Sequence, residues 1–143
     1  MSRHIDTVIS IAAPPGRVWQ VLTDFASYPE WNPFIRSIQG KAEAGARLRV
    51  EIEAAGKRHV FKPLVLQATE GRTLRWLGRV GFPGLFDGEH GFFLEPDGAG
   101  TRLRQEESFQ GFLVPLLWRE VGPATHAGFE AMNSALKARA EGA

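Results

Sequence analysis

A histidine and a glutamate on facing strands of a predicted hairpin are the residues of this chain best suited to chemistry. The segment Pro96-Asp97-Gly98-Ala99-Gly100 is the strongest turn signal in the sequence. A hairpin closed at this turn pairs Glu95 with Arg102, and the same register places His90 opposite Glu107. Opposed residues on one face of an antiparallel pair have Cβ atoms about 4.5–5.5 Å apart. We therefore predict that His90 and Glu107 touch, provided that the register does not slip by one residue.

Strand alternation decides which side of the hairpin this pair faces. Arg102, Arg104 and Glu106 fall on one face, which we assign to solvent. The other face carries the pair together with one amide and several apolar side chains: Phe92, Leu94, Leu103, Gln105 and Phe109. The pair is therefore predicted to point toward a mainly apolar interior.

Three roles are open to an ionisable pair in such surroundings. His90 and Glu107 can anchor a ligand carbonyl or hydroxyl group. They can also act as a general acid and base, and we expect the carboxylate to raise the pKa of the histidine. Alternatively, they form a satisfied buried pair that only fixes the hairpin. His90 and Glu107 are candidates for catalysis on this basis, and all three roles stay open at this point.

Aromatic residues are the second candidate set for a binding site. The chain holds four tryptophans and ten phenylalanines, more than a small core requires, and ligand pockets are typically apolar with few polar groups. Packing in the core remains the alternative for each single aromatic residue. With the polar residues of the hairpin included, the predicted ligand-binding set is Trp31, Trp76, Phe86, His90, Phe92, Gln105, Glu107, Phe109, Trp118 and Phe129.

Composition and spacing narrow the remaining chemistry. The chain has no cysteine, which excludes disulfides and thiolate nucleophiles, and its net charge of +1 does not favour nucleic acid as a partner. The glycine-rich segment 78–86 lacks the lysine of a phosphate loop, so we predict that it borders the mouth of a pocket. No metal and no cofactor are expected, because the four histidines lack the spacing of metal ligands: His4, His59, His90 and His126.

Length and hydropathy suggest a single soluble domain over residues 1–143. The N-terminus lacks the apolar stretch of a signal peptide, and no later run approaches the length of a transmembrane helix. We therefore expect a cytoplasmic location and no integral membrane association. The oligomeric state, monomer or homodimer, stays open.

The elements that must position the candidate residues follow from hydrophobic periodicity. Residues 5–11 alternate as a half-buried strand, Pro14-Pro15 then opens a short helix, and a second short helix or turn follows at 27–31. The middle of the chain is predicted to form strands, including a long apolar one over 59–68. Near the C-terminus apolar residues recur every three or four positions. This spacing predicts a long helix, which Gly122-Pro123 should either kink or begin.

Three local motifs in this order of elements resemble the START-like superfamily, also called the SRPBCC, helix-grip or Bet v 1-like fold. They are the strand–proline–helix segment 11–24, the segment Tyr28-Pro29-Glu30-Trp31-Asn32-Pro33-Phe34, and the C-terminal run 128–137. Within the superfamily the chain is similar to the bacterial polyketide cyclase/dehydrase-like group. The resemblance implies an α+β helix-grip fold, in which a curved antiparallel sheet of about seven strands surrounds a long C-terminal helix and two short helices follow the first strand.

The resemblance also implies a cavity between the sheet and the C-terminal helix. We expect this cavity to bind a small hydrophobic molecule, lipid- or polyketide-like. One alternative is an enzyme of the polyketide cyclase/dehydratase type that uses His90 and Glu107 as its acid/base pair. Another is a protein-interaction module similar to the co-chaperone members of the fold. Such a module needs an exposed apolar patch, which the mixed-charge outer face of the sheet does not offer.

Overall fold

Strands and one long helix make up most of residues 2–142, the part of the chain that the computed structural model describes. The predicted order of strand, two short helices, strands and a long helix is confirmed. Over these residues the elements are β1 (Ser2–Ile11), α1 (Pro15–Thr23), the 3₁₀ turn η1 (Phe25–Ser27), α2 (Tyr28–Trp31), β2 (Ile35–Gln39), β3 (Arg49–Ala54), β4 (Lys57–Phe61), β5 (Leu64–Thr69), β6 (Thr73–Val80), β7 (Phe86–Asp97), β8 (Gly100–Gln110) and α3 (Val114–Glu141).

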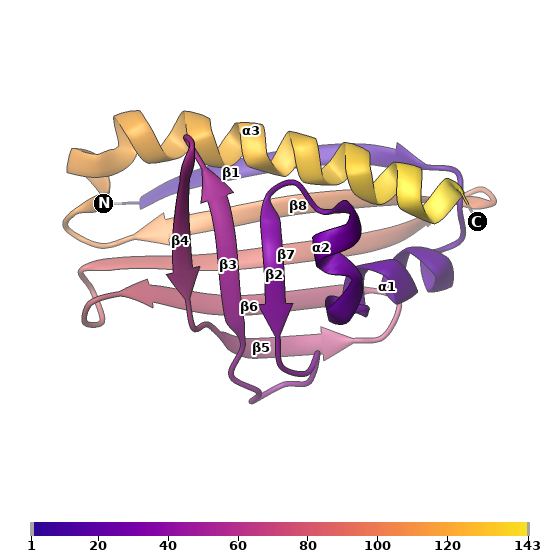
Figure 1. Ribbon diagram of the computed structural model, residues 1–143, viewed down its shortest axis with the longest axis horizontal. Helices are drawn as coiled ribbons and strands as arrows, with labels where there is room; N and C mark the ends of the chain where they lie inside the picture. Colours follow the sequence, from indigo (N-terminus) through magenta and orange to yellow (C-terminus); the bar gives the residue numbers. More distant parts are fainter. Residues whose placement is uncertain (1, 143) are drawn as a thin grey trace.

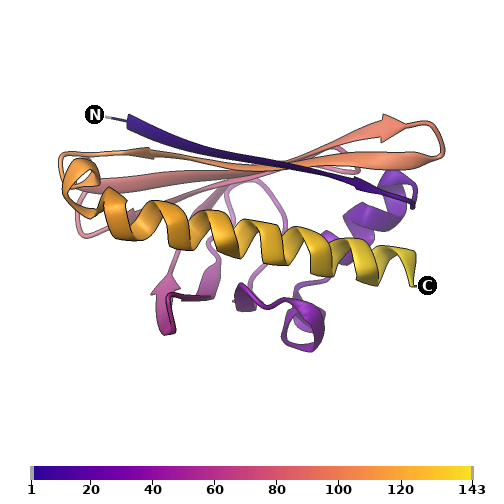
Figure 2. The same cartoon turned by 90° about the horizontal axis from the view of Figure 1, so that it is seen from above.

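Five strands form the main sheet, in the antiparallel order β1-β8-β7-β6-β5. Figure 2 shows this sheet as one layer, with α3 and the other elements on the same side of it. The side chains of Leu103, Gln105 and Phe109 alternate along β8 and are buried on that side. The predicted α+β helix-grip architecture is therefore the observed one.

The hairpin of β7 and β8 has the register that the sequence predicted. Glu95 pairs with Arg102, and His90 pairs with Glu107. Gly98 in the turn has φ +60°, a left-handed conformation that glycine adopts at little cost. The turn thus sets the pairing of the whole hairpin, and with it the position of the candidate pair.

The remaining three strands form a smaller sheet of order β2-β3-β4 that crosses the long strands steeply (Figure 1). An isolated bridge between Arg47 and Leu64 connects its chain segment to the main sheet. The predicted single strand over 59–68 is wrong: β4 ends at Phe61 and β5 begins at Leu64. Pro63 lies between them, and proline has no N–H to donate to a strand ladder. The described chain therefore has eight strands where about seven were expected.

Helix α3 runs along the main sheet beside β1 (Figures 1 and 2). It begins at Val114 and continues through Pro123, so the predicted alternative in which the helix starts at Gly122-Pro123 is wrong. Pro123 is exposed, and solvent can bond to the carbonyl group that loses its helical partner there. The buried face of α3 includes Phe129, Met132 and Asn133.

The two ends of the molecule are filled differently. At one end, α1 and α2 pack against the C-terminal half of α3, so helices occupy the space beneath the main sheet (Figure 1). At the other end, the N-terminal half of α3 faces the β3–β4 hairpin instead. The space enclosed at this second end is where the candidate site lies.

Candidate functional site

A cavity of about 800 Å³ opens between the main sheet, the β3–β4 hairpin and the N-terminal half of α3. This volume is in the range that binds small organic molecules. Two of the ionisable residues that line the cavity, His90 and Glu107, are shielded from solvent, whereas the others lie in exposed positions. Most of the remaining wall is apolar and includes Val50, Ile52, Phe61, Trp76, Phe86, Phe109, Leu113 and Val121.

His90 is enclosed by aromatic rings and is only 2% exposed. The centroid of its imidazole lies 4.7 Å from that of Phe92, 4.8 Å from that of Phe129 and 5.0 Å from that of Trp76. Burial lowers the pKa of His90 to about 4, so the ring is neutral at neutral pH. The expectation that Glu107 raises this pKa is wrong: burial lowers it, and the contribution that opposes burial comes from the hydrogen bond to Gln105.

Glu107 faces His90 across the hairpin. Its Oε1 atom lies 3.7 Å from His90 Nδ1, which is too far for a hydrogen bond. The side chain is 17% exposed, and burial raises its pKa to about 8, so the carboxyl group is protonated at neutral pH. Gly88 makes room for it, because a Cβ at that position would overlap Glu107 Oε2. The shielded pair in the cavity is thus electrically neutral.

A chain of buried hydrogen bonds lies behind His90. Its Nε2 is 2.9 Å from Gln105 Oε1, and Gln105 Nε2 donates to Asn133 Oδ1 over 2.7 Å. Asn133 Nδ2 donates to Thr7 Oγ1 over 2.9 Å, and the Thr7 hydroxyl donates to the carbonyl oxygen of Gln105 over 2.8 Å. These four side chains come from β7, β8, α3 and β1, so the chain joins the sheet to the helix.

The sequence did not predict the roles of Thr7 and Asn133. Each is a polar residue at an otherwise inward-facing position: Thr7 follows the parity of Ile5 in β1, and Asn133 adjoins Met132 on the buried face of α3. A polar residue inside an apolar pattern is a signal for a buried hydrogen-bond network. The partners themselves depend on how α3 lies against the sheet, which periodicity does not specify.

Five residues of the predicted ligand-binding set line the cavity: Trp76, Phe86, His90, Glu107 and Phe109. Three others, Phe92, Gln105 and Phe129, are fully buried and contact His90 from behind. Trp118 packs on Phe109 with 5.4 Å between the ring centroids and is not part of the lining. These four residues therefore lie behind the lining residues and do not form the surface of the cavity.

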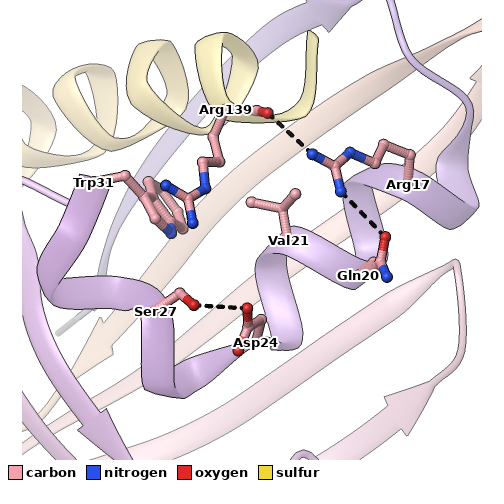
Figure 3. A pocket seen from close by; sticks show the side chains of 7 residues that line it. All are labelled: Arg17, Gln20, Val21, Asp24, Ser27, Trp31 and Arg139. Atoms are coloured by element: carbon pink, nitrogen blue, oxygen red, sulfur yellow. Dashed lines mark hydrogen bonds between the residues drawn. The ribbon is translucent and has the colours of Figure 1, made fainter. Parts of the chain in front are cut away.

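Trp31 lies at a different place from the rest of the set. It borders a separate pocket of about 140 Å³ between α1, α2 and the last turns of α3 (Figure 3). In this pocket Arg17 donates to the main-chain carbonyl groups of Arg139 and Ala140 over 3.3 and 3.4 Å. These contacts satisfy carbonyl groups that a helix end leaves without partners. The pocket thus lies where α1 is bonded to the last turn of α3, and Trp31 belongs to that end of the molecule.

Several lining residues were absent from the prediction. Val50 and Ile52 alternate with charged residues in the sequence, which indicates an inward-facing position, and Val121 falls in the apolar repeat of the long helix. Arg79 also lines the cavity and pairs with Asp87 over 3.5 Å. Their place in the lining depends on the β3–β4 hairpin crossing in front of the main sheet, which the sequence pattern does not specify.

Exposed apolar side chains lie close in sequence to the cavity lining, in two segments whose apolar composition indicates exposed or gating groups: the loop around Phe82 and residues 111–118. The rings of Phe82 and Phe112 lie 6.3 Å apart, and Leu116 in the first turn of α3 is 76% exposed. The glycine-rich segment 78–86 borders the cavity, as predicted, through Gly78 and Gly81 among others. The exposed side chains are thus sequence neighbours of the lining residues Gly81, Leu113 and Leu117.

One group of possible metal ligands lies on the outer face of the sheet. His4, Asp6 and Glu106 bring their ligand atoms within 4.8 Å of one another. His4 Nδ1 is engaged by Ser108 Oγ at 2.9 Å, and Glu106 accepts a hydrogen bond from Arg104 over 2.8 Å. These contacts, one between β1 and β8 and one along β8, explain the group as polar pairing on a solvated face.

Comparison with known proteins identifies the family. A model of the family described as "Polyketide cyclase / dehydrase and lipid transport" matches residues 2–141. The chain belongs to this family. No curated protein is significantly similar to it in sequence. Within residues 2–142, no helix has both the length and the apolar character needed to span a membrane.

Solved structures of this superfamily share the fold. The Zhui aromatase/cyclase from Streptomyces sp. R1128 is 18% identical with a TM-score of 0.81, and 99% of this chain and 94% of that chain are covered. A START superfamily protein from Mycobacterium smegmatis is 24% identical, with a TM-score of 0.75 and coverage of 96% and 97%. Ara h 8.0201 is 15% identical, with a TM-score of 0.71 and 100% of both chains covered. At these identities the likeness shows the START-like, Bet v 1-like fold alone.

The perturbed pKa values of the pair predict how stability depends on pH. Folding raises the pKa of Glu107 from 4.5 to about 8, so its contribution to stability falls as the pH rises between these values. Folding lowers the pKa of His90 from 6.5 to about 4, so its contribution rises with pH over that interval. The two effects oppose each other up to pH 6.5, and between pH 6.5 and 8 we expect a loss on the order of 2 kcal/mol.

Glu107→Gln should abolish this loss, because the amide is neutral at every pH. Urea denaturation at pH 6.5 and 8.5 measures the free energy of unfolding of both proteins. Glu106→Gln, the neighbouring residue on the opposite face of β8, is the control and should keep the wild-type pH dependence. The same decline in Glu107→Gln as in the wild type would contradict the assignment.

Proposed function

We propose that this protein binds a small hydrophobic molecule in the cavity between the main sheet, the β3–β4 hairpin and α3. The observation that carries the proposal is the cavity of about 800 Å³ with a mainly apolar wall. Protein interiors are normally close-packed, so an apolar space of this size is not explained by folding alone. Membership of a family described by polyketide cyclases, dehydrases and lipid transport supports a ligand of lipid-like or polyketide-like character.

Burial of apolar surface supplies the affinity in this proposal. A ligand that buries about 300 Å² of apolar surface gains roughly 7 kcal/mol at about 25 cal/mol per Å², before the cost of ordering ligand and protein. Micromolar affinity is therefore within reach without any charged contact. The exposed side chains of Phe82, Phe112 and Leu116, which are sequence neighbours of lining residues, would favour capture of an apolar molecule.

Filling the cavity from one helix position tests the proposal. Ala124 lines the cavity on α3, whereas Ala127 on the same helix is exposed and lies outside it. Ala124→Phe should weaken the binding of an uncharged fluorescent dye such as N-phenyl-1-naphthylamine at least 10-fold, because the added ring occupies ligand space. Ala127→Phe introduces the same ring and should leave the affinity unchanged. Dye titration gives both constants, and equal weakening in the two variants would contradict the cavity as the binding site.

Acid–base catalysis is a second candidate, which one observation favours. Glu107 is a protonated acid that lies 3.7 Å from a neutral imidazole nitrogen inside an apolar cavity. In the dehydration of a β-hydroxy ketone, Glu107 would protonate the leaving hydroxyl group while His90 Nδ1 removes the α-proton. A C–H and a C–O bond break, a C=C bond forms and water leaves. Proton return from His90 to Glu107 then restores the pair.

Turnover of a β-hydroxy aryl ketone tests this second candidate. Glu107→Gln keeps the shape of the side chain but has no acidic proton, so we expect kcat to fall at least 100-fold while KM changes little. Absorbance of the conjugated enone follows the reaction. Absence of turnover in the wild type, or an unchanged kcat in Glu107→Gln, would leave ligand binding as the function.

A further inference from the structure

The buried hydrogen-bond chain has a single possible direction. The carbonyl oxygen of Gln105 can only accept, so Thr7 must donate its one hydroxyl hydrogen to it across the 2.8 Å contact. Thr7 Oγ1 is then the acceptor for Asn133 Nδ2. This orients the Asn133 amide, whose Oδ1 accepts from Gln105 Nε2. The two amide groups are thus oriented by a main-chain atom at the end of the chain.

This direction fixes the tautomer of His90. Gln105 Oε1 faces His90 Nε2 over 2.9 Å, so that nitrogen must carry a hydrogen. A neutral imidazole has only one N–H, which leaves Nδ1 as a bare acceptor. Nδ1 points to the side of the ring where Glu107 lies, with 3.7 Å to its Oε1 atom.

His90 Nδ1 and the carboxyl group of Glu107 are the two polar groups of the pair that face the cavity. Among residues 2–142, no hydrogen bond reaches His90 Nδ1 or the carboxyl group of Glu107, although both residues line the cavity. One offers a lone pair and the other, in its protonated form, offers an O–H. Atoms 3.7 Å apart can both contact a single oxygen placed about 2.8 Å from each.

We propose that the cavity selects neutral apolar ligands bearing a hydroxyl group, such as a phenol, an enol or an alcohol, whose oxygen bridges Glu107 and His90 Nδ1. A hydroxyl group accepts the hydrogen of Glu107 and donates its own to His90. A carbonyl or ether oxygen can only accept, so it leaves Nδ1 without a partner. A carboxylate places a charge beside Trp76 and Phe109, where its desolvation is not compensated.

This inference rests on ligand binding in the cavity and specifies the ligand class. Equilibrium dialysis at pH 6.5 with four probes of one shape tests it: 2-naphthol, 2-methoxynaphthalene, naphthalene and 2-naphthoate. We expect 2-naphthol to bind about 10-fold more tightly than its methyl ether, because the ether lacks the donor, and 2-naphthoate to bind most weakly. Equal affinities for 2-naphthol and its methyl ether overturn the inference and leave ligand binding intact. No binding of any probe contradicts ligand binding itself.

Two variants remove the bridge by different routes. Glu107→Leu deletes the donor and is compatible with an apolar wall. Gly88→Ala adds a Cβ that would overlap Glu107 Oε2 and so displaces the carboxyl group without altering its chemistry. Both should reduce the preference for 2-naphthol over the ether to less than 2-fold while naphthalene still binds. Glu106→Gln, on the outer face, should keep the full preference, and a preference retained in both site variants would overturn the bridge.

Discussion

The buried hydrogen-bond chain from Thr7 through Asn133 and Gln105 to His90 is the interaction on which the rest of the structure depends. It joins β1, α3, β8 and β7, and each of its members is almost fully buried. A shift of α3 along the sheet would break both bonds of Asn133, and each buried polar group that loses its partner costs about 1–3 kcal/mol. The chain therefore fixes the position of α3 over the sheet and the orientation of the His90 ring together.

Because His90 and Glu107 are both electrically neutral, the pair can lie beside an apolar cavity. Three aromatic rings surround His90 and disfavour its protonation, and burial keeps Glu107 protonated. An ionised pair in the same place would carry a desolvation penalty of several kcal/mol per ion. Because α1 and α2 fill only one end of the space under the sheet, the other end stays open and holds this neutral pair. The cavity thus combines an apolar wall with one donor and one acceptor.

The sequence predicted those parts of the site that depend on local geometry. The turn at Gly98 set the register, so the pairing of His90 with Glu107 and the inward parity of Phe109 followed from counting along two strands. The sign of the His90 pKa shift did not follow, because it depends on rings that approach from another strand and from α3: Trp76 and Phe129. Trp31 shares the aromatic character of the lining, yet it lies beneath the far end of α3.

The fold was predictable to a similar extent. The order of elements and the long C-terminal helix followed from periodicity and family resemblance. The break at Pro63 did not, nor did the choice at Pro123 between a kink within the helix and its start, because the effect of a proline depends on whether its surroundings need the missing N–H. The crossing of the β3–β4 hairpin over the main sheet creates the cavity, and it is a tertiary arrangement without a local signal.

Nitrogen NMR of the histidine side chains, with and without 2-naphthol at neutral pH, tests the central claim most directly. The direction of the buried hydrogen bonds assigns the hydrogen of His90 to Nε2 and leaves Nδ1 as the acceptor that faces the cavity. The predicted result is a neutral ring protonated at Nε2, in which the Nδ1 resonance moves strongly on addition of the ligand and the Nε2 resonance moves little. A ring protonated at Nδ1, or a ligand that binds without changing the Nδ1 resonance, would contradict the account.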